Sequence, residues 1–145
     1  MITFKSMRYS ILLMLLSTTL AVAGESATRG EDLFGKSCAA CHSIIAENSR
    51  LIAGNGRDNA PNLNDLTERS PGSDSNYRYG VSLASYSAQT PRWDQEAFVA
   101  YVMDPTGFLR SRLGDRRARS RMSYRVRYEA DAIDLYAFIL ETQNR

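Results

Sequence analysis

Cys38-Ala39-Ala40-Cys41-His42 is the stretch of this sequence that decides the fold. It contains both cysteines of the 145-residue chain and its single histidine. The spacing C-x-x-C-H is typical of covalent haem attachment. On a helix, two cysteines three residues apart lie on one face, so both thiols can form thioethers with the vinyl groups of one porphyrin. The histidine that follows is then placed to bind the iron.

Three other kinds of site use cysteine and histidine. A thioredoxin-like redox pair begins a helix after a strand, and the residues before Cys38 show no strand pattern. A structural disulfide over so short a loop restricts the unfolded chain little and leaves His42 without a role. A zinc site needs a fourth nitrogen or sulfur ligand, and the chain contains no further cysteine or histidine. Haem attachment is therefore the favoured hypothesis.

The N-terminus has the pattern of an export signal. Lys5 and Arg8 precede an apolar run from residue 11 to residue 23, which ends in the small-x-small sequence Ala21-Val22-Ala23. The run covers about 13 residues, too few to span a bilayer comfortably. The pattern predicts a signal peptide over residues 1–23, one domain over residues 24–145 and a periplasmic location. An uncleaved leader that anchors the protein in the membrane is the alternative.

Charge is concentrated in one part of the predicted mature chain. The sequence has 18 basic and 16 acidic residues. The only charged residues of the leader are Lys5 and Arg8, so 16 basic and 16 acidic residues remain and the mature chain is formally neutral. From Arg110 to Arg127 there are eight arginines and one acid, a local charge of +7. Such a patch is expected to steer a partner with an acidic docking surface. The alternatives are a solvated helix face, a loop that folds on itself or contact with an anionic lipid surface. No nucleic-acid recognition motif accompanies the run.

The first part of the mature chain predicts a helix followed by loops. Thr28-Arg29-Gly30-Glu31 matches a capping box, so a first helix is expected to begin near Thr28 and to end at the cysteine motif. Residues 43–60 and 69–76 are rich in loop-forming residues and are expected to be loops. No segment has a convincing strand pattern.

Two further helices are expected in the second half of the chain. Asp94 is a suitable N-cap for a helix that ends before Pro105. The last helix is expected from about Glu129 to Thr142. Its core face is marked by residues at i, i+4 and i+7, which are Ile133, Ala137 and Leu140.

From Gly30 to Leu140 the chain resembles the class I cytochromes c, in particular the mitochondrial and related bacterial electron carriers. Gly30, Phe34 and Cys38 recur at four-residue steps as in the first helix of that family, and residues 134–139 are similar to its final helix. The resemblance implies an all-α cytochrome c fold, with three main helices plus short helices and long loops wrapped around one covalently bound haem c.

The same resemblance implies that the first and last helices cross at close range. Gly30 has no side chain, so Leu135 and Phe138 could approach the first helix there and bury aromatic area.

The resemblance also implies roles for residues in the middle of the chain. The Pro61 carbonyl would accept a hydrogen bond from His42, orient it and raise its basicity. Arg69, Tyr79 and Trp93 would hydrogen-bond or neutralise a buried haem propionate, which is otherwise costly to desolvate. For Tyr79 and Trp93, plain aromatic packing in the core is the alternative.

A methionine is expected as the second iron ligand. Outside the leader only Met103 and Met122 remain, and Met122 resembles the ligand of the family because it lies between the last two helices. Met103 is the alternative, although it ends a predicted helix. Tyr101 matches the family position that hydrogen-bonds near the ligand sulfur. The predicted iron ligands are thus His42 and Met122.

Two segments depart from the family pattern. The connection from Pro105 to Met122 is longer than usual and contains arginines in place of a Pro-Gly turn. The stretch between His42 and Pro61 is also longer than usual.

The resulting functional hypothesis is a one-electron carrier between respiratory or dehydrogenase partners, expected to be monomeric and not an enzyme. Iron bound by both histidine and methionine has no open position for a substrate. The alternative is a haem enzyme or gas-binding sensor with an open distal position.

Overall fold

The computed structural model describes residues 24–90 and 92–143, and the predicted leader, residues 1–23, lies outside them. Residues 24–33 are already helical, and the helix continues as a π-helical turn, η1, over Phe34–Cys38. The prediction that the helix begins near Thr28 is therefore wrong. The Thr28 hydroxyl donates to the Gly24 carbonyl at 3.0 Å, a bond to the preceding turn that a threonine inside a helix can make.

A short hairpin follows the cysteine motif. Strands β1 (Ile44–Ile45) and β2 (Leu51–Ala53) pair antiparallel, and the prediction of a loop over residues 43–60 is wrong for these five residues. The strands are built mainly from β-branched and large apolar residues, which favour extended backbone. A 3₁₀ turn, η2, follows at Leu66–Glu68.

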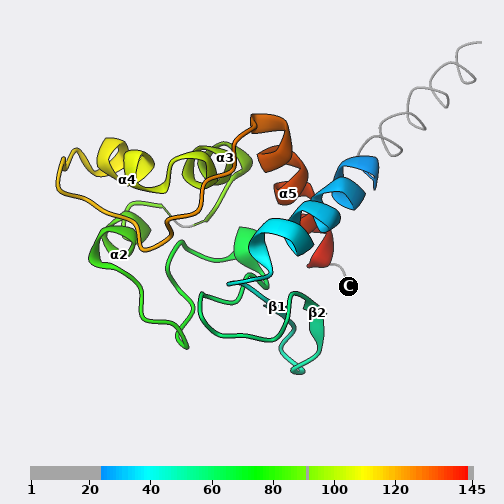
Figure 1. The fold of residues 1–145 in the computed structure, drawn as a ribbon. Coiled ribbons are helices and arrows are strands. Elements are labelled where there is room, and N and C mark those ends of the chain that lie inside the picture. The colour runs from blue at the N-terminus through cyan, green and yellow to red at the C-terminus, as the bar shows by residue number, and fades with distance from the viewer. Residues whose placement is uncertain (1–23, 91, 144–145) are drawn as a thin grey trace, which may run out of the picture.

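Four helices form the rest of the structure (Figure 1). They are α2 (Val81–Ser87), α3 (Gln95–Met103), α4 (Pro105–Leu113) and α5 (Glu129–Thr142). The N-terminal helix and α5 lie on one side of the molecule, α2 and α4 lie on the other, and α3 lies between them. The predicted predominance of helices is confirmed, and the bounds of α5 are those expected.

Helix α3 confirms the predicted cap, whereas α4 was not predicted. The Asp94 carboxylate accepts from the Ala97 amide at 2.7 Å, and α3 ends at Met103 as expected. Pro105 ends one helix but also occupies the first turn of the next, where its missing amide proton costs nothing. The Asp104 carboxylate caps α4 by accepting from the Gly107 amide at 3.1 Å.

The buried face of α5 differs from the prediction. Leu140 is 44% exposed, and Ile133 and Ala137 are only partly buried. The core side chains are instead those at i, i+3, i+6 and i+7, which are Ala132, Leu135, Phe138 and Ile139. The helix is apolar over most of its circumference, so spacing alone fits more than one row.

The predicted close crossing at Gly30 is confirmed. A Cβ atom at Gly30 would lie 1.9 Å from the Asp134 carbonyl oxygen and 2.7 Å from the Phe138 Cβ. The rings of Phe34 and Phe138 lie 5.5 Å apart beside the crossing. Arg29 donates to the Asp134 carboxylate at 2.7 and 3.1 Å, so an ion pair also joins the two helices. The helix that ends in the cysteine motif is therefore held firmly against α5.

Candidate haem-binding site

One pocket brings together all the residues predicted for the site. They come from the cysteine motif, the segment after the hairpin, the residues just before α3, α3 itself and the connection between α4 and α5: Cys38, Cys41, His42, Pro61, Arg69, Tyr79, Trp93, Tyr101 and Met122. Met103 is not among the lining residues. Apolar side chains from η2, α2, α3 and α5 complete the wall: Leu66, Leu83, Phe98, Val102, Leu135 and Ile139.

The cysteine motif forms a tight turn at one edge of this pocket. The π-helical turn closes with the Ala39 amide donating to the Phe34 carbonyl at 2.9 Å. The Cys38 carbonyl then accepts from the Cys41 amide at 3.0 Å and from the His42 amide at 2.9 Å. Both thiols line the pocket, and they are not joined to each other. Burial, with a smaller contribution from Cys41, raises the pKa of the Cys38 thiol to about 11.

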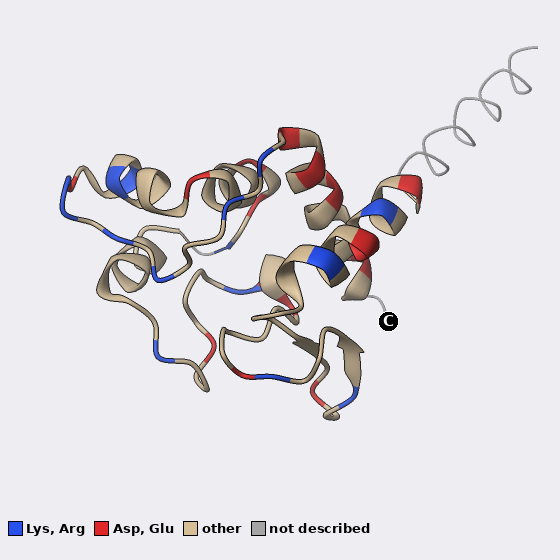
Figure 2. Ribbon diagram, in the orientation of Figure 1, with Lys and Arg blue, Asp and Glu red and all other residues tan. Residues whose placement is uncertain are grey.

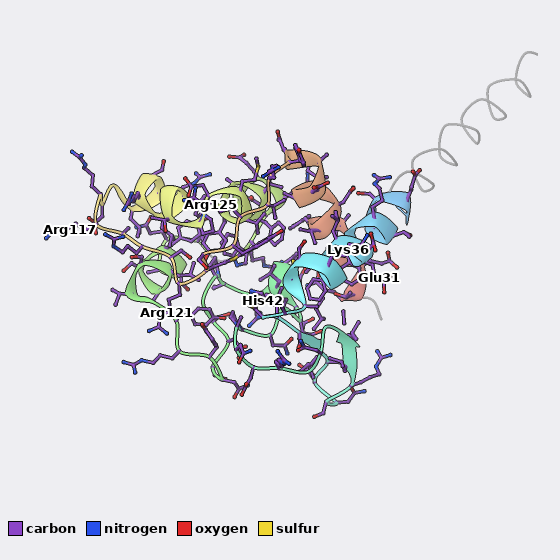
Figure 3. The ribbon with its side chains drawn as sticks, viewed as in Figure 1. Glu31, Lys36, His42, Arg117, Arg121 and Arg125 are labelled. Carbon is purple, nitrogen blue, oxygen red and sulfur yellow. The ribbon has the colours of Figure 1, made fainter. Side chains whose placement is uncertain are left out.

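One ring nitrogen of His42, Nδ1, is hydrogen-bonded to a carbonyl, and the other, Nε2, is free to bind a metal. Its Nδ1 lies 2.9 Å from the Pro61 carbonyl oxygen, and because that oxygen can only accept, Nδ1 must hold the proton. Burial lowers the pKa of His42, and the hydrogen bond to Pro61 opposes that shift. The neutral imidazole therefore has its lone pair on Nε2, which is the form that binds metals. Figure 3 shows His42 below the end of the N-terminal helix.

Arg69 has an unsatisfied donor in the pocket wall. One of its terminal nitrogens donates to the Asn62 carbonyl, whereas its Nε is buried and has no hydrogen-bond partner in the part of the chain that the structure describes. Burying such a donor without an acceptor costs free energy. A carboxylate in the pocket would satisfy it, and Tyr79, whose pKa is raised by burial, lines the same pocket.

Trp93 and Tyr101 belong to a cluster of four aromatic rings. Trp93 lies 5.1 Å from Tyr101 and 5.9 Å from Tyr86, and Phe108 of α4 lies 5.7 Å from Tyr101. Both the packing role and the pocket-lining role of Trp93 are therefore present in the structure. The unpredicted helices α2 and α4 supply Tyr86 and Phe108, which fix the orientation of the other two rings.

The segment that contains Met122 is held by Ser120, which the sequence did not single out. The Ser120 hydroxyl lies 2.8 Å from the Tyr101 hydroxyl and accepts from the Met122 amide at 3.1 Å. Burial raises the pKa of Tyr101, so its hydroxyl stays protonated at neutral pH. Tyr101 thus fixes the backbone beside Met122. Tyr77, whose ring lies 5.0 Å from that of Tyr79, is another lining residue that carried no signal in the sequence.

The donor set of this pocket fits haem c. Two thiols lie at one edge, a neutral imidazole offers Nε2, a thioether sulfur lines the same pocket, and the buried Nε of Arg69 lacks an acceptor. Most of the remaining wall is apolar, which suits a porphyrin ring. The assignment of the individual ligands and propionate contacts stays a prediction.

The arginine run borders this pocket. All eight arginines between Arg110 and Arg127 are exposed, and Arg119 and Arg121 line the pocket. Figure 2 shows basic residues along α4 and its connection to α5, and acidic residues on α5 and the N-terminal helix.

Intramolecular partners occupy only some of these arginines. Arg112 pairs with Glu96 at 3.3 Å, and Arg125 pairs with Asp104 at 2.9 Å. Within residues 24–90 and 92–143, no ion pair joins Arg117, which extends outward in Figure 3. The patch therefore keeps cationic groups available to another molecule.

Comparison with known proteins finds relatives that are cytochromes c. The family model described as cytochrome c matches residues 27–143. Cytochrome c2 of Rhodovulum adriaticum is 37% identical over 118 residues, which is 81% of this chain and 92% of that protein. Cytochrome c-551 of Roseobacter denitrificans is 35% identical over 126 residues, which is 87% of this chain and 88% of that protein.

Solved structures show the same fold. Cytochrome c2 from Rhodobacter sphaeroides superposes with a TM-score of 0.75 at 33% identity, over 79% of this chain and 93% of that chain. Cytochrome c2 from Rhodobacter capsulatus gives a TM-score of 0.73 at 31% identity, over 80% and 97%. None of the helices within residues 24–90 and 92–143 is both long and apolar enough to cross a bilayer.

Proposed function

The chain belongs to the cytochrome c family, with the cytochrome c fold and one covalently attached haem c, and we propose that it is an exported, monomeric one-electron carrier between respiratory or dehydrogenase partners. The haem supplies an iron that gains or loses a single electron. The protein is an electron-transfer protein and not an enzyme.

The observation that supports this proposal best is that His42 and Met122 line one pocket. An iron bound by both side chains keeps no open position for a substrate or a gas. Methionine also favours the reduced iron and raises the reduction potential. The alternative of an enzyme or sensor with an open distal position lacks any such support.

The chain's own residues bind and orient the group. Cys38 and Cys41 attach it, and the Pro61 carbonyl holds the His42 ring with Nε2 directed away from the bond. Ser120 and Tyr101 fix the backbone beside Met122. Arg69 provides a buried donor for a propionate.

Two methionine variants test the ligand assignment. In the purified holoprotein, Met122→Ala should convert a low-spin spectrum to a high-spin or ligand-exchanged one, because the iron loses a ligand. Met103→Ala is the matched control, since Met103 does not line the pocket, and it should leave the spectrum unchanged. The opposite pattern would move the ligand to Met103. Rapid binding of carbon monoxide to the reduced wild type would favour the open-site alternative.

We also propose that the arginine run docks partners with an acidic surface. The supporting observation is that the arginines of the run are exposed and that two of them, Arg119 and Arg121, line the pocket that would hold the haem. Because exposed charges are screened by salt, the rate of electron transfer to the partner should fall steeply as ionic strength rises.

A charge-reversal pair tests the docking site. Arg117→Glu should lower the low-salt electron-transfer rate severalfold. Arg92→Glu is the control, because Arg92 is also exposed but lies outside the arginine run and pairs with Glu68 at 2.9 Å. Equal effects of the two variants, or a rate that does not respond to salt, would reject the docking site.

Export and processing are part of the same proposal. The small-x-small sequence that ends at Ala23 places the cleavage site after that residue. N-terminal sequencing of the periplasmic protein should therefore begin at Gly24, whereas a protein retained in the membrane with residue 1 intact would support the anchored alternative.

A further inference from the structure

The peptide group between Pro61 and Asn62 is hydrogen-bonded at both ends. Its carbonyl oxygen lies 2.9 Å from Nδ1 of His42. Its amide nitrogen, which belongs to Asn62, donates to Oδ2 of Asp74 at 3.1 Å. A carboxylate and the imidazole of His42 are thus joined through one peptide group, although 32 residues separate them in the sequence.

The orientation of this peptide group is fixed by its surroundings. The Asn62 side chain accepts from the Ile45 amide at 2.9 Å and donates to the Ile45 carbonyl at 2.8 Å. Arg69 donates to the Asn62 carbonyl. Asn62 is therefore attached to strand β1 and to the pocket wall, so the peptide cannot rotate without breaking several bonds.

The carboxylate of Asp74 is held in place as well. Its Oδ1 accepts from the Asn76 amide at 3.0 Å, which leaves Oδ2 for the Asn62 amide. The residue is only partly buried.

A charged acceptor strengthens the hydrogen bonds further along a chain of bonds. The negative charge on Asp74 polarises the Pro61–Asn62 peptide and makes the Pro61 carbonyl a stronger acceptor. A stronger acceptor at Nδ1 makes the His42 imidazole more basic. A more basic imidazole stabilises ferric iron more than ferrous iron.

We propose that Asp74 is a positioning residue that acts on His42 through the Pro61–Asn62 peptide and lowers the reduction potential. The inference rests on the proposed function, in which His42 binds the iron. Nothing in the sequence marks this aspartate, because its partner is a backbone amide 12 residues earlier.

The test compares Asp74→Asn with Asp65→Asn in the holoprotein. Asparagine keeps an acceptor oxygen but removes the charge. Asp65 is the matched control, because it is also a partly buried aspartate near Asn62, its φ of 53° is one that asparagine tolerates, and its carboxylate accepts from Asn64 at 2.5 Å. Two quantities are measured in each protein: the proton chemical shift of His42 Nδ1–H in the ferrous state, and the midpoint potential at low and high salt.

Asp74→Asn should move the Nδ1–H resonance upfield. It should also raise the midpoint potential by up to about 59 mV, which for one electron corresponds to an increase of up to about tenfold in the ratio of ferrous to ferric protein. The change in potential should largely persist at high salt, because an interaction through a partly buried chain of hydrogen bonds is screened much less than one between exposed charges. Asp65→Asn should leave the resonance in place, and any change in its potential should shrink with salt.

An unmoved Nδ1–H resonance in Asp74→Asn would overturn the inference, whether or not the potential changes. The inference would also be overturned if Asp74→Asn and Asp65→Asn moved the Nδ1–H resonance equally. Should Asp74→Asn fold poorly, Asp74→Ser also offers a short neutral acceptor and must give the same upfield movement. Failure of the proposed function is distinguishable, because it would remove the low-spin, His42-ligated spectrum from the wild type itself.

Discussion

Replacing Gly30 by alanine tests how the helix that ends in the cysteine motif is held. The added Cβ would lie 1.9 Å from the Asp134 carbonyl oxygen, whereas ordinary contact begins at 3.4 Å. The N-terminal helix and α5 must therefore separate by about 1.5 Å, because the obstacle is backbone and not the end of a flexible side chain.

The magnitude follows from three contributions. Overpacking in a well-packed core costs about 1–3 kcal/mol, and a backbone obstacle favours the upper half of that range. Pulling Phe34 away from Phe138, whose rings lie 5.5 Å apart, weakens an aromatic pair that contributes about 0.5–1.5 kcal/mol. Alanine recovers about 1 kcal/mol of helix propensity. The expected net loss is about 2–3 kcal/mol.

Urea unfolding of the holoprotein, followed by far-ultraviolet circular dichroism, measures this loss. With a slope of about 2 kcal/mol per molar, the midpoint should fall by about 1 M. Gly35→Ala is the matched control in the same helix, because no atom lies within 4 Å of the Cβ it would add. It should be neutral or stabilise by up to about 1 kcal/mol. Equal stability of the two variants would refute the close crossing.

Three further variants test other contacts. Hydrogen bonding from Arg29 keeps the pKa of Asp134 low. At pH values above the ordinary aspartate pKa, Asp134→Asn should therefore lower the free energy of unfolding by about 1–2 kcal/mol, and this loss should shrink as the pH falls through the lowered pKa. Urea titrations across pH measure it, and a loss that persists in acid would contradict the reasoning. Tyr101→Phe removes the bond to Ser120 and should lower stability by about 1 kcal/mol while leaving the haem attached, as judged by the urea midpoint and the absorption spectrum; an unchanged midpoint would show that the bond is dispensable. Asp94→Ala removes the cap of α3 and should also cost about 1 kcal/mol, whereas Asp94→Ser, which retains a capping oxygen, should recover most of the loss in the same titration.

Much of the architecture could be predicted because a few residues have one strong structural use. The cysteine motif and the cap at Asp94 follow from local chemistry, whereas the close crossing at Gly30 was implied by the family resemblance. The residues that the family resemblance suggested for the site all line one pocket. The cysteine motif and the cap depend on residue type and spacing, which the sequence displays directly, and the remaining features depend on the family pattern.

The features that were missed depend on context. Pro105 stops α3, but its fixed backbone also suits the first turn of α4, and only the Asp104 cap distinguishes the two outcomes. Thr28 matches the sequence pattern of a capping box, but the same residue can also lie inside a helix and bond to the preceding turn, as it does here. The strands of the hairpin are only two and three residues long, too short for alternation to show.

Roles that arise from long-range backbone bonds were also beyond the sequence. Ser120 and Asp74 do not stand out in the sequence. Ser120 gains its role through contact with the Tyr101 hydroxyl, and Asp74 gains its role by accepting from the Asn62 amide. Such partners are set by tertiary structure, not by spacing.

The most direct test of the account is the mass of the mature protein, purified from cells able to attach haem and measured after denaturation and acid extraction. We expect the chain to keep one haem under these conditions, and a proteolytic peptide spanning Cys38 to His42 to contain it with neither thiol free. A colourless chain with the mass of the polypeptide alone, its two cysteines free or joined to each other, would contradict the central claim.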